Sequence, residues 1–145
     1  MRYQIETVKI SLDVQESEGE KLTGDLGAYR VLNEYYKTLD ADQEHFSILI
    51  LDQKNHIRGL KTLFTGGENT AIIDKKVLFR TALLMGAVGL ILCHNHPSGE
   101  SYPSNEDLKA TMEIKEGAEI LGLRILDHIV LGKNEFYSFN DKGLL

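Results

Sequence analysis

The stretch that decides the fold is Val88-Gly89-Leu90-Ile91-Leu92-Cys93-His94-Asn95-His96-Pro97. Its first six residues, 88–93, form a short and almost wholly apolar run, which is typical of a central strand covered on both faces. Side chains two residues apart along a strand point the same way, so His94 and His96 should leave the end of this strand on one face. Cys93 should face the opposite side. The stretch therefore predicts a buried strand that brings two imidazoles together at its end.

The other elements are predicted from hydrophobic periodicity and from turn-forming residues. We expect helices over 24–39, from an N-cap at Asp74 to about Gly86, and from Ser104 to about Leu121. We expect strands over 5–12, 46–51, 57–64, 88–93, 123–131 and 136–139, an acidic loop over 13–21, and a loop rich in Gly, Ser and Pro over 97–103. Because helices interleave with strands and no second-domain boundary interrupts them, the predicted fold class is a single α/β (α+β) domain, a mixed β-sheet flanked by helices.

Composition limits the kinds of protein that this chain can be. The 145 residues include 16 Lys and Arg against 22 Asp and Glu, a formal charge of −6, which predicts no strong non-specific binding to nucleic acid. Folding at this length buries roughly two-thirds of the surface of the unfolded chain, so the core needs no structural metal. The single cysteine, Cys93, excludes an internal disulfide framework and favours a reducing, cytoplasmic setting. A signal peptide and a membrane span are not predicted, because no cleavable apolar leader and no apolar run of about 18 residues is found.

Asp107 is the natural third member of a metal site with His94 and His96. It lies in the first turn of the helix that follows loop 97–103, and this loop has the size to fold that turn over the end of the strand. Catalytic Zn²⁺ usually takes three protein ligands from His and Asp or Glu and keeps a fourth position for water. Two plainer interpretations remain open. The histidines can be partly buried polar residues, and Ser104-x-x-Asp107 has the spacing of a helix capping box.

The segment 94–107 resembles a known family motif. His94-x-His96-Pro97, followed after seven residues by Ser104-x-x-Asp107, is similar to the JAMM (JAB/MPN) metalloprotease motif, and the run His-Asn-His-Pro-Ser-Gly is similar to its bacterial RadC-type branch. The resemblance runs from about residue 26 to 140 and includes Glu44-His45-Phe46 and Leu126-Asp127-His128. It implies the JAB/MPN (cytidine deaminase-like) architecture over residues 24–145, with an N-terminal strand and acidic loop, 1–23, outside the match.

The resemblance also implies a role for each candidate residue. His94, His96 and Asp107 would ligate zinc, Glu44 would act beside the metal as general acid/base, and Ser104 would steady the reacting oxygen. The implied chemistry is coherent, because zinc lowers the pKa of bound water and polarises a carbonyl, a carboxylate takes the proton, and a hydroxyl stabilises the oxyanion. Without the resemblance, a Glu before a strand would be interpreted as a solvated surface charge.

Other polar residues are weaker candidates. Cys93 is expected to be a buried core residue, although thiolate ligation stays formally open. His128 follows Asp127 in an otherwise apolar strand, where a hydrogen-bonded structural histidine is expected rather than a ligand. His45 and His56 lie at a strand start and in a hairpin, and neither joins the predicted site. Gly66-Gly67 is expected to form a simple turn, because no Gly-Lys-Ser/Thr follows.

The function implied by the resemblance is that of a zinc-dependent JAMM-type hydrolase acting on a peptide or isopeptide bond in an unidentified protein or peptide substrate. The RadC-type branch also carries a DNA-repair name. The alternative is a non-catalytic, metal-containing binding module in DNA repair or mobile-element maintenance that acts through partners. RadC-type proteins usually carry an N-terminal helix-hairpin-helix region, and only residues 1–23 precede the match here, so that DNA-binding part is expected to be missing. A zinc deaminase is excluded, because its Pro-Cys-x-x-Cys signature needs two cysteines. The sequence indicates no oligomeric state.

Overall fold

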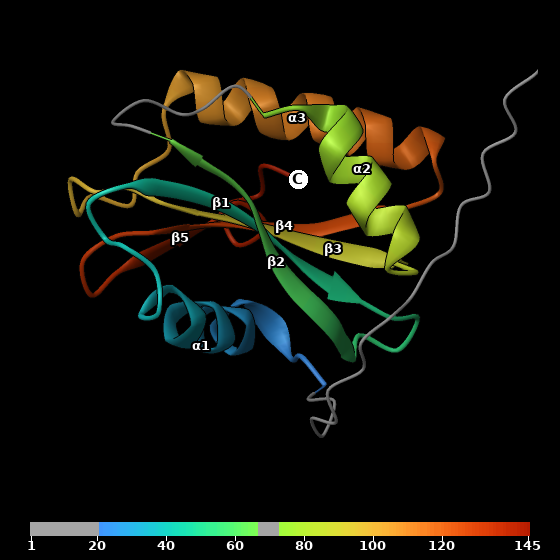
Figure 1. Ribbon diagram of the computed structural model, residues 1–145, viewed down its shortest axis with the longest axis horizontal. Coiled ribbons are helices and arrows are strands. Elements are labelled where there is room, and N and C mark those ends of the chain that lie inside the picture. The colour runs from blue at the N-terminus through green and yellow to red at the C-terminus, as the bar shows by residue number, and fades with distance from the viewer. Residues whose placement is uncertain (1–20, 67–72) are drawn as a thin grey trace, which may run out of the picture.

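The computed structural model describes residues 21–66 and 73–145, in which five strands form one mixed sheet between helices (Figure 1). The strands are β1 (Glu44–Leu51), β2 (Ile57–Gly66), β3 (Gly89–Asn95), β4 (Arg124–Leu131) and β5 (Phe136–Ser138), in the order β2-β1-β3-β4-β5. Helix α1 (Gly24–Tyr36) covers one face, and α2 (Lys75–Leu84) and α3 (Asn105–Ile120) cover the other. The predicted α+β class, with a mixed sheet flanked by helices, is confirmed.

Strand β3 lies at the centre of this sheet, as its apolar run predicts. It pairs antiparallel with β1 and parallel with β4, and α3 provides the long crossover that a parallel pair requires. Leu92 packs into the core beneath α2 and α3, whereas Cys93 packs into the core beneath α1. Cys93 and the preceding Leu92 therefore face opposite sides, and His94 shares the α3 side of the sheet with Leu92, as the period of two requires.

Apolar side chains form a hydrophobic core on each face of the sheet. The core beneath α2 and α3 is formed by Phe46, Ile48, Ile50, Leu78, Ala82, Leu90, Leu92, Ile114, Ala118 and Leu123. The core beneath α1 is formed by Leu22, Ala28, Leu32, Leu49, Leu51, Ile91, Cys93, Ile129 and Leu131. Burial of these side chains supplies the main stabilisation of the domain, at roughly 25 cal/mol per Å² of apolar surface. The sheet packed between these cores carries polar residues at the end of its central strands.

Several boundaries differ from the sequence prediction. Helix α1 ends at Tyr36 rather than Leu39, and a turn follows in which Thr38 donates its hydroxyl to the carbonyl of Tyr35 at 2.6 Å. Strand β1 begins at Glu44 rather than Phe46, because Glu44 pairs with Gly66 of β2. The strand predicted over 5–12 and most of the acidic loop lie outside the described residues. No helix in the described ranges has the length and apolar character needed to cross a bilayer.

Candidate metal centre

Four side chains with metal-ligating atoms meet at one end of the central strands. Glu44 begins β1, His94 and His96 lie at the end of β3 and just beyond it, and Asp107 lies in the first turn of α3. One ligating atom from each lies within 4.8 Å of the others. Oδ2 of Asp107 is 3.3 Å from Nε2 of His94 and 3.2 Å from Nε2 of His96, and the two Nε2 atoms are 3.0 Å apart. These residues form a group that could hold a metal ion.

Sheet register explains how Glu44 reaches the histidines. Phe46 pairs with His94 across the antiparallel β1 and β3 strands, and Glu44 lies two residues before Phe46 on the same face. Phe46 belongs to the core beneath α3, so Glu44 also faces α3 and the first turn of that helix. Its Oε1 lies 3.8 Å from Nε2 of His94. Because β1 begins earlier than predicted, Glu44 lies within the strand rather than before it. Its side chain is therefore a buried member of the cluster.

Asp107 is held in place by the start of α3. Ser104 caps the helix, since its hydroxyl accepts from the Asp107 amide at 3.1 Å and its own amide donates to Asp107 Oδ2 at 2.9 Å. The capping box expected as the plainer interpretation is therefore present. It does not compete with metal binding, because the same Oδ2 that accepts from Ser104 also faces both histidines. The role of Ser104 beside a reacting oxygen stays a prediction.

His96 has a defined proton position. Its Nδ1 lies 2.8 Å from the carbonyl oxygen of Glu100, which can only accept a hydrogen bond. Nδ1 therefore carries the hydrogen, and in the neutral ring Nε2 keeps its lone pair toward His94 and Asp107. The loop after β3 thus orients the second imidazole for ligation.

The carboxylates of the cluster have opposite electrostatic environments. Burial raises the pKa of Glu44, and the charge of Asp107 adds to this effect while His94 opposes it. Burial would also raise the pKa of Asp107, but the His94 and His96 rings that face its Oδ2 outweigh this effect and hold that pKa well below its usual range. The hydrogen bond with Asp107 raises the pKa of His96. The pKa values of the two carboxylates are thus shifted in opposite directions, upward for Glu44 and downward for Asp107.

Glu44 also supplies a test of whether a cation fits here. Within the described residues, its buried Oε1 accepts no hydrogen bond. A buried carboxylate oxygen without a donor is costly, and a cation beside it removes that cost. Two imidazoles and two carboxylates are ligands that suit Zn²⁺ and other first-row divalent ions. The residues present therefore fit a bound metal ion.

Asn95 joins the start of β1 to the end of β3, and the sequence alone does not predict this contact. It lies between the two histidines, and its amide spans the backbone on both sides of Glu44. Nδ2 donates to the carbonyl of Gln43 at 2.9 Å, and Oδ1 accepts from the amide of His45 at 2.8 Å. This clamp ties the start of β1 to the end of β3. In the sequence, this contact is indicated only by an amide side chain between two candidate ligands. The backbone groups that Asn95 binds are identified by the pairing of β1 with β3.

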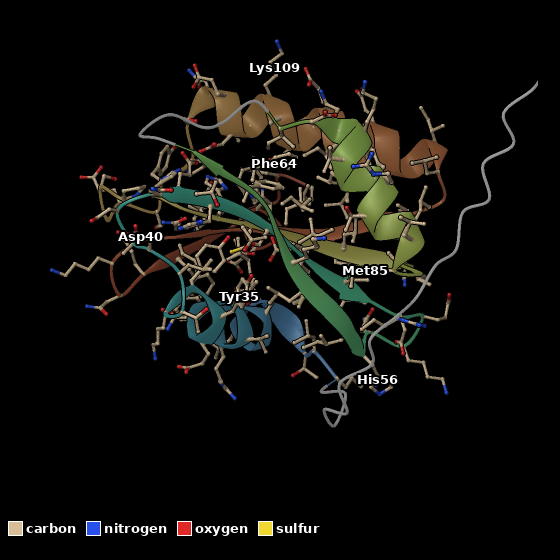
Figure 2. All side chains as sticks on the ribbon, in the orientation of Figure 1. Tyr35, Asp40, His56, Phe64, Met85 and Lys109 are labelled. Atoms are coloured by element: carbon tan, nitrogen blue, oxygen red, sulfur yellow. The ribbon has the colours of Figure 1, made fainter. Side chains whose placement is uncertain are left out.

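The remaining histidines lie outside the group of four. His45 contacts the carbonyl of Asp40 at 2.7 Å and the hydroxyl of Thr65 at 2.9 Å. His56 lies at the β1–β2 turn, at the other end of β1 from Glu44 (Figure 2). His128 is fully buried and hydrogen-bonded, as expected, and burial places its pKa well below the usual value. Its Nε2 lies 2.7 Å from Nδ1 of His94, so His128 contacts a candidate ligand from behind.

We predict that the thiol of Cys93 behaves as a buried core group rather than as a reactive one. Its side chain is fully buried, and burial raises the pKa of the thiol. Because the thiolate is the reactive form, we expect the folded protein to react with iodoacetamide at least about 100-fold more slowly than the protein in denaturant. Mass spectrometry of timed samples measures both rates. Equal rates in the two conditions would show that this side chain is accessible.

The mixed sheet with its Glu, His, His and Asp at one end defines an α+β domain of the JAB/MPN class. The chain belongs to the RadC-like JAB domain family, whose model matches residues 24–144.

Similar curated proteins bear the name UPF0758 protein. They include those of Clostridium beijerinckii, 38% identical over 106 residues, Clostridium botulinum, 43% over 103 residues, and Listeria monocytogenes, 44% over 101 residues. The matched regions cover 73%, 71% and 70% of this chain and 46%, 45% and 45% of the relatives. The chain therefore spans about half the length of these relatives, and their names state no enzymatic activity.

Proposed function

We propose that the protein is a zinc-dependent hydrolase that cleaves a peptide or isopeptide bond in a protein or peptide substrate. The observation that carries this proposal is the convergence of one ligating atom each from Glu44, His94, His96 and Asp107 within 4.8 Å. His94, His96 and Asp107 would hold the Zn²⁺. When bound, the ion supplies Lewis-acid chemistry, since it lowers the pKa of water and polarises a carbonyl.

The carboxylates of Asp107 and Glu44 have different roles in this proposal. Asp107 stays ionised, because the histidines lower its pKa, and its Oδ2 is held by the Ser104 amide. Glu44 has a raised pKa and an Oε1 that accepts no hydrogen bond from the described residues. Neighbouring acids whose pKa values are driven apart are a common pattern in acid–base catalysis. Glu44 accordingly takes the proton of the attacking water and returns it to the leaving amine.

Ser104 can add a hydrogen-bond donor without giving up its cap. Its oxygen accepts from the Asp107 amide, which leaves the hydroxyl hydrogen for a second partner. A donor placed where negative charge develops stabilises the oxyanion that forms when water attacks a carbonyl. We assign this role to Ser104.

We also propose a cellular environment and a class of substrate for this protein. The only cysteine of the chain is buried, and a single cysteine leaves no disulfide framework within the chain, which fits a reducing, cytoplasmic environment. The formal charge of −6 disfavours direct binding to a phosphate backbone, so the substrate is a polypeptide rather than a nucleic acid.

Metal analysis followed by a cleavage screen tests this function. Protein purified without a polyhistidine tag should carry about one zinc per chain by elemental mass spectrometry. It should cleave members of a library of linear and lysine-branched peptides, lose activity with a chelator, and regain it with Zn²⁺. Failure to take up added Zn²⁺ would overturn the metal site. Bound zinc without cleavage would overturn the hydrolase and favour a metal-containing binding module in DNA repair or mobile-element maintenance.

A further inference from the structure

A line of buried hydrogen bonds runs behind the candidate metal centre through three elements. On α3, the hydroxyl of Thr111 lies 2.6 Å from the carbonyl oxygen of Asp107. The same hydroxyl lies 2.6 Å from Nδ1 of His128 on β4. Nε2 of His128 lies 2.7 Å from Nδ1 of His94 on β3. All four residues are at most 1% exposed, so water does not compete for these bonds.

The hydroxyl of Thr111 determines which atom donates and which accepts in these hydrogen bonds. It has one hydrogen, and the carbonyl of Asp107 can only accept. At 2.6 Å the two oxygens need that hydrogen between them. The Thr111 oxygen must therefore accept from His128, and the hydrogen of the His128 ring lies on Nδ1.

Because His128 is neutral, it also determines which ring nitrogen of His94 carries the hydrogen. The ring stacks on Phe139, with centroids 4.7 Å apart, and meets Phe46 edge-on at 6.0 Å. A second hydrogen would place a positive charge beside these two phenylalanine rings and away from solvent, which is costly. Nε2 of His128 is therefore an acceptor, and Nδ1 of His94 donates to it.

We infer that Thr111 and His128 are positioning residues that hold His94 in its Nδ1–H tautomer, so that the lone pair of Nε2 points at Asp107 and His96. This inference rests on the proposed metal site, because the tautomer matters only if Nε2 ligates an ion. The carbonyl of Glu100 sets the same tautomer in His96. Outer hydrogen bonds of this kind commonly change metal affinity by about 10- to 100-fold.

Two substitutions at Thr111 separate this role from simple packing. Thr111→Val keeps the shape and removes the hydroxyl, so His128 is free to place its hydrogen on Nε2 and oppose the needed tautomer of His94. Thr111→Ser keeps the hydroxyl and loses a methyl group. We expect Zn²⁺ affinity, measured by competition with a chromogenic chelator, to fall about 10- to 100-fold in the Val variant and to change less than about threefold in the Ser variant. A packing role predicts the opposite order, and that order would overturn the inference.

A second measurement works without metal and without activity. Nitrogen-15 spectra of the histidine rings in the metal-free protein should show the Nδ1–H form of His94 in the parent and in Thr111→Ser. Thr111→Val should show loss of that single form. An Nε2–H form of His94 in the parent would overturn the inference even if zinc binds. A parent that fails to bind zinc but shows the Nδ1–H form would instead overturn the proposed function and leave the tautomer assignment standing.

Discussion

Replacing Asp107 by asparagine should remove zinc binding while leaving helix α3 capped. The Asn side chain keeps the shape and one oxygen for the Ser104 amide, but it loses the negative charge that faces both histidines. Because loss of a direct ligand exceeds the effect of an outer hydrogen bond, we expect Zn²⁺ affinity to fall by more than about 100-fold. Elemental analysis gives the metal content, and thermal unfolding monitored by circular dichroism measures stability.

Glu106→Gln is the matched control for this substitution. Glu106 lies in the same first turn of α3, is exposed, and loses the same unit of charge. It should keep about one zinc per chain. Asp107→Ala also removes the hydrogen bond that Oδ2 accepts from the Ser104 amide, while the Ser104 hydroxyl still caps the backbone amide of residue 107. Its additional loss of stability, about 0.5–1.5 kcal/mol, therefore reports that one hydrogen bond. If Asp107→Asn binds zinc as tightly as the parent, Asp107 is not a ligand.

Replacing Glu44 by glutamine should separate metal binding from turnover. The amide keeps the size of the side chain but cannot take a proton, so hydrolysis should fall by about 10²- to 10⁴-fold while zinc content stays near one per chain. The measurement is the rate of cleavage of whichever peptide the screen identifies, together with the metal content of the same sample. The loss should be in kcat, because Glu44 is proposed to act on the proton rather than to bind the substrate.

Asp42→Asn provides the control for Glu44→Gln. Asp42 is exposed, lies two residues before Glu44, and does not belong to the group of four. Its loss should leave both zinc and cleavage unchanged. Loss of zinc from Glu44→Gln would make Glu44 a ligand rather than a base. An unchanged rate in Glu44→Gln would contradict the hydrolase mechanism.

The local parts of this domain were predictable because their signals are periodic along the chain. The apolar run 88–93 identified β3 and its two faces, and the alternation separated Cys93 from His94. Turn residues located the loop 97–103, and the spacing from Ser104 to Asp107 predicted the helix cap that is present. The family motif added Glu44, which the residues alone would have left on the surface.

The sequence by itself determined the class of fold, the central strand and three of the four residues that the structure brings together, namely His94, His96 and Asp107. The structure decided their arrangement. The pairing of Phe46 with His94 places Glu44 beside the histidines, and the parallel register of β3 and β4 places His128 behind His94. A period of two or of 3.6 residues reports which face a side chain occupies, but it carries no information on which distant strand lies alongside. Strand order and register depend on the packing of the whole core, and they therefore emerge only in the folded chain.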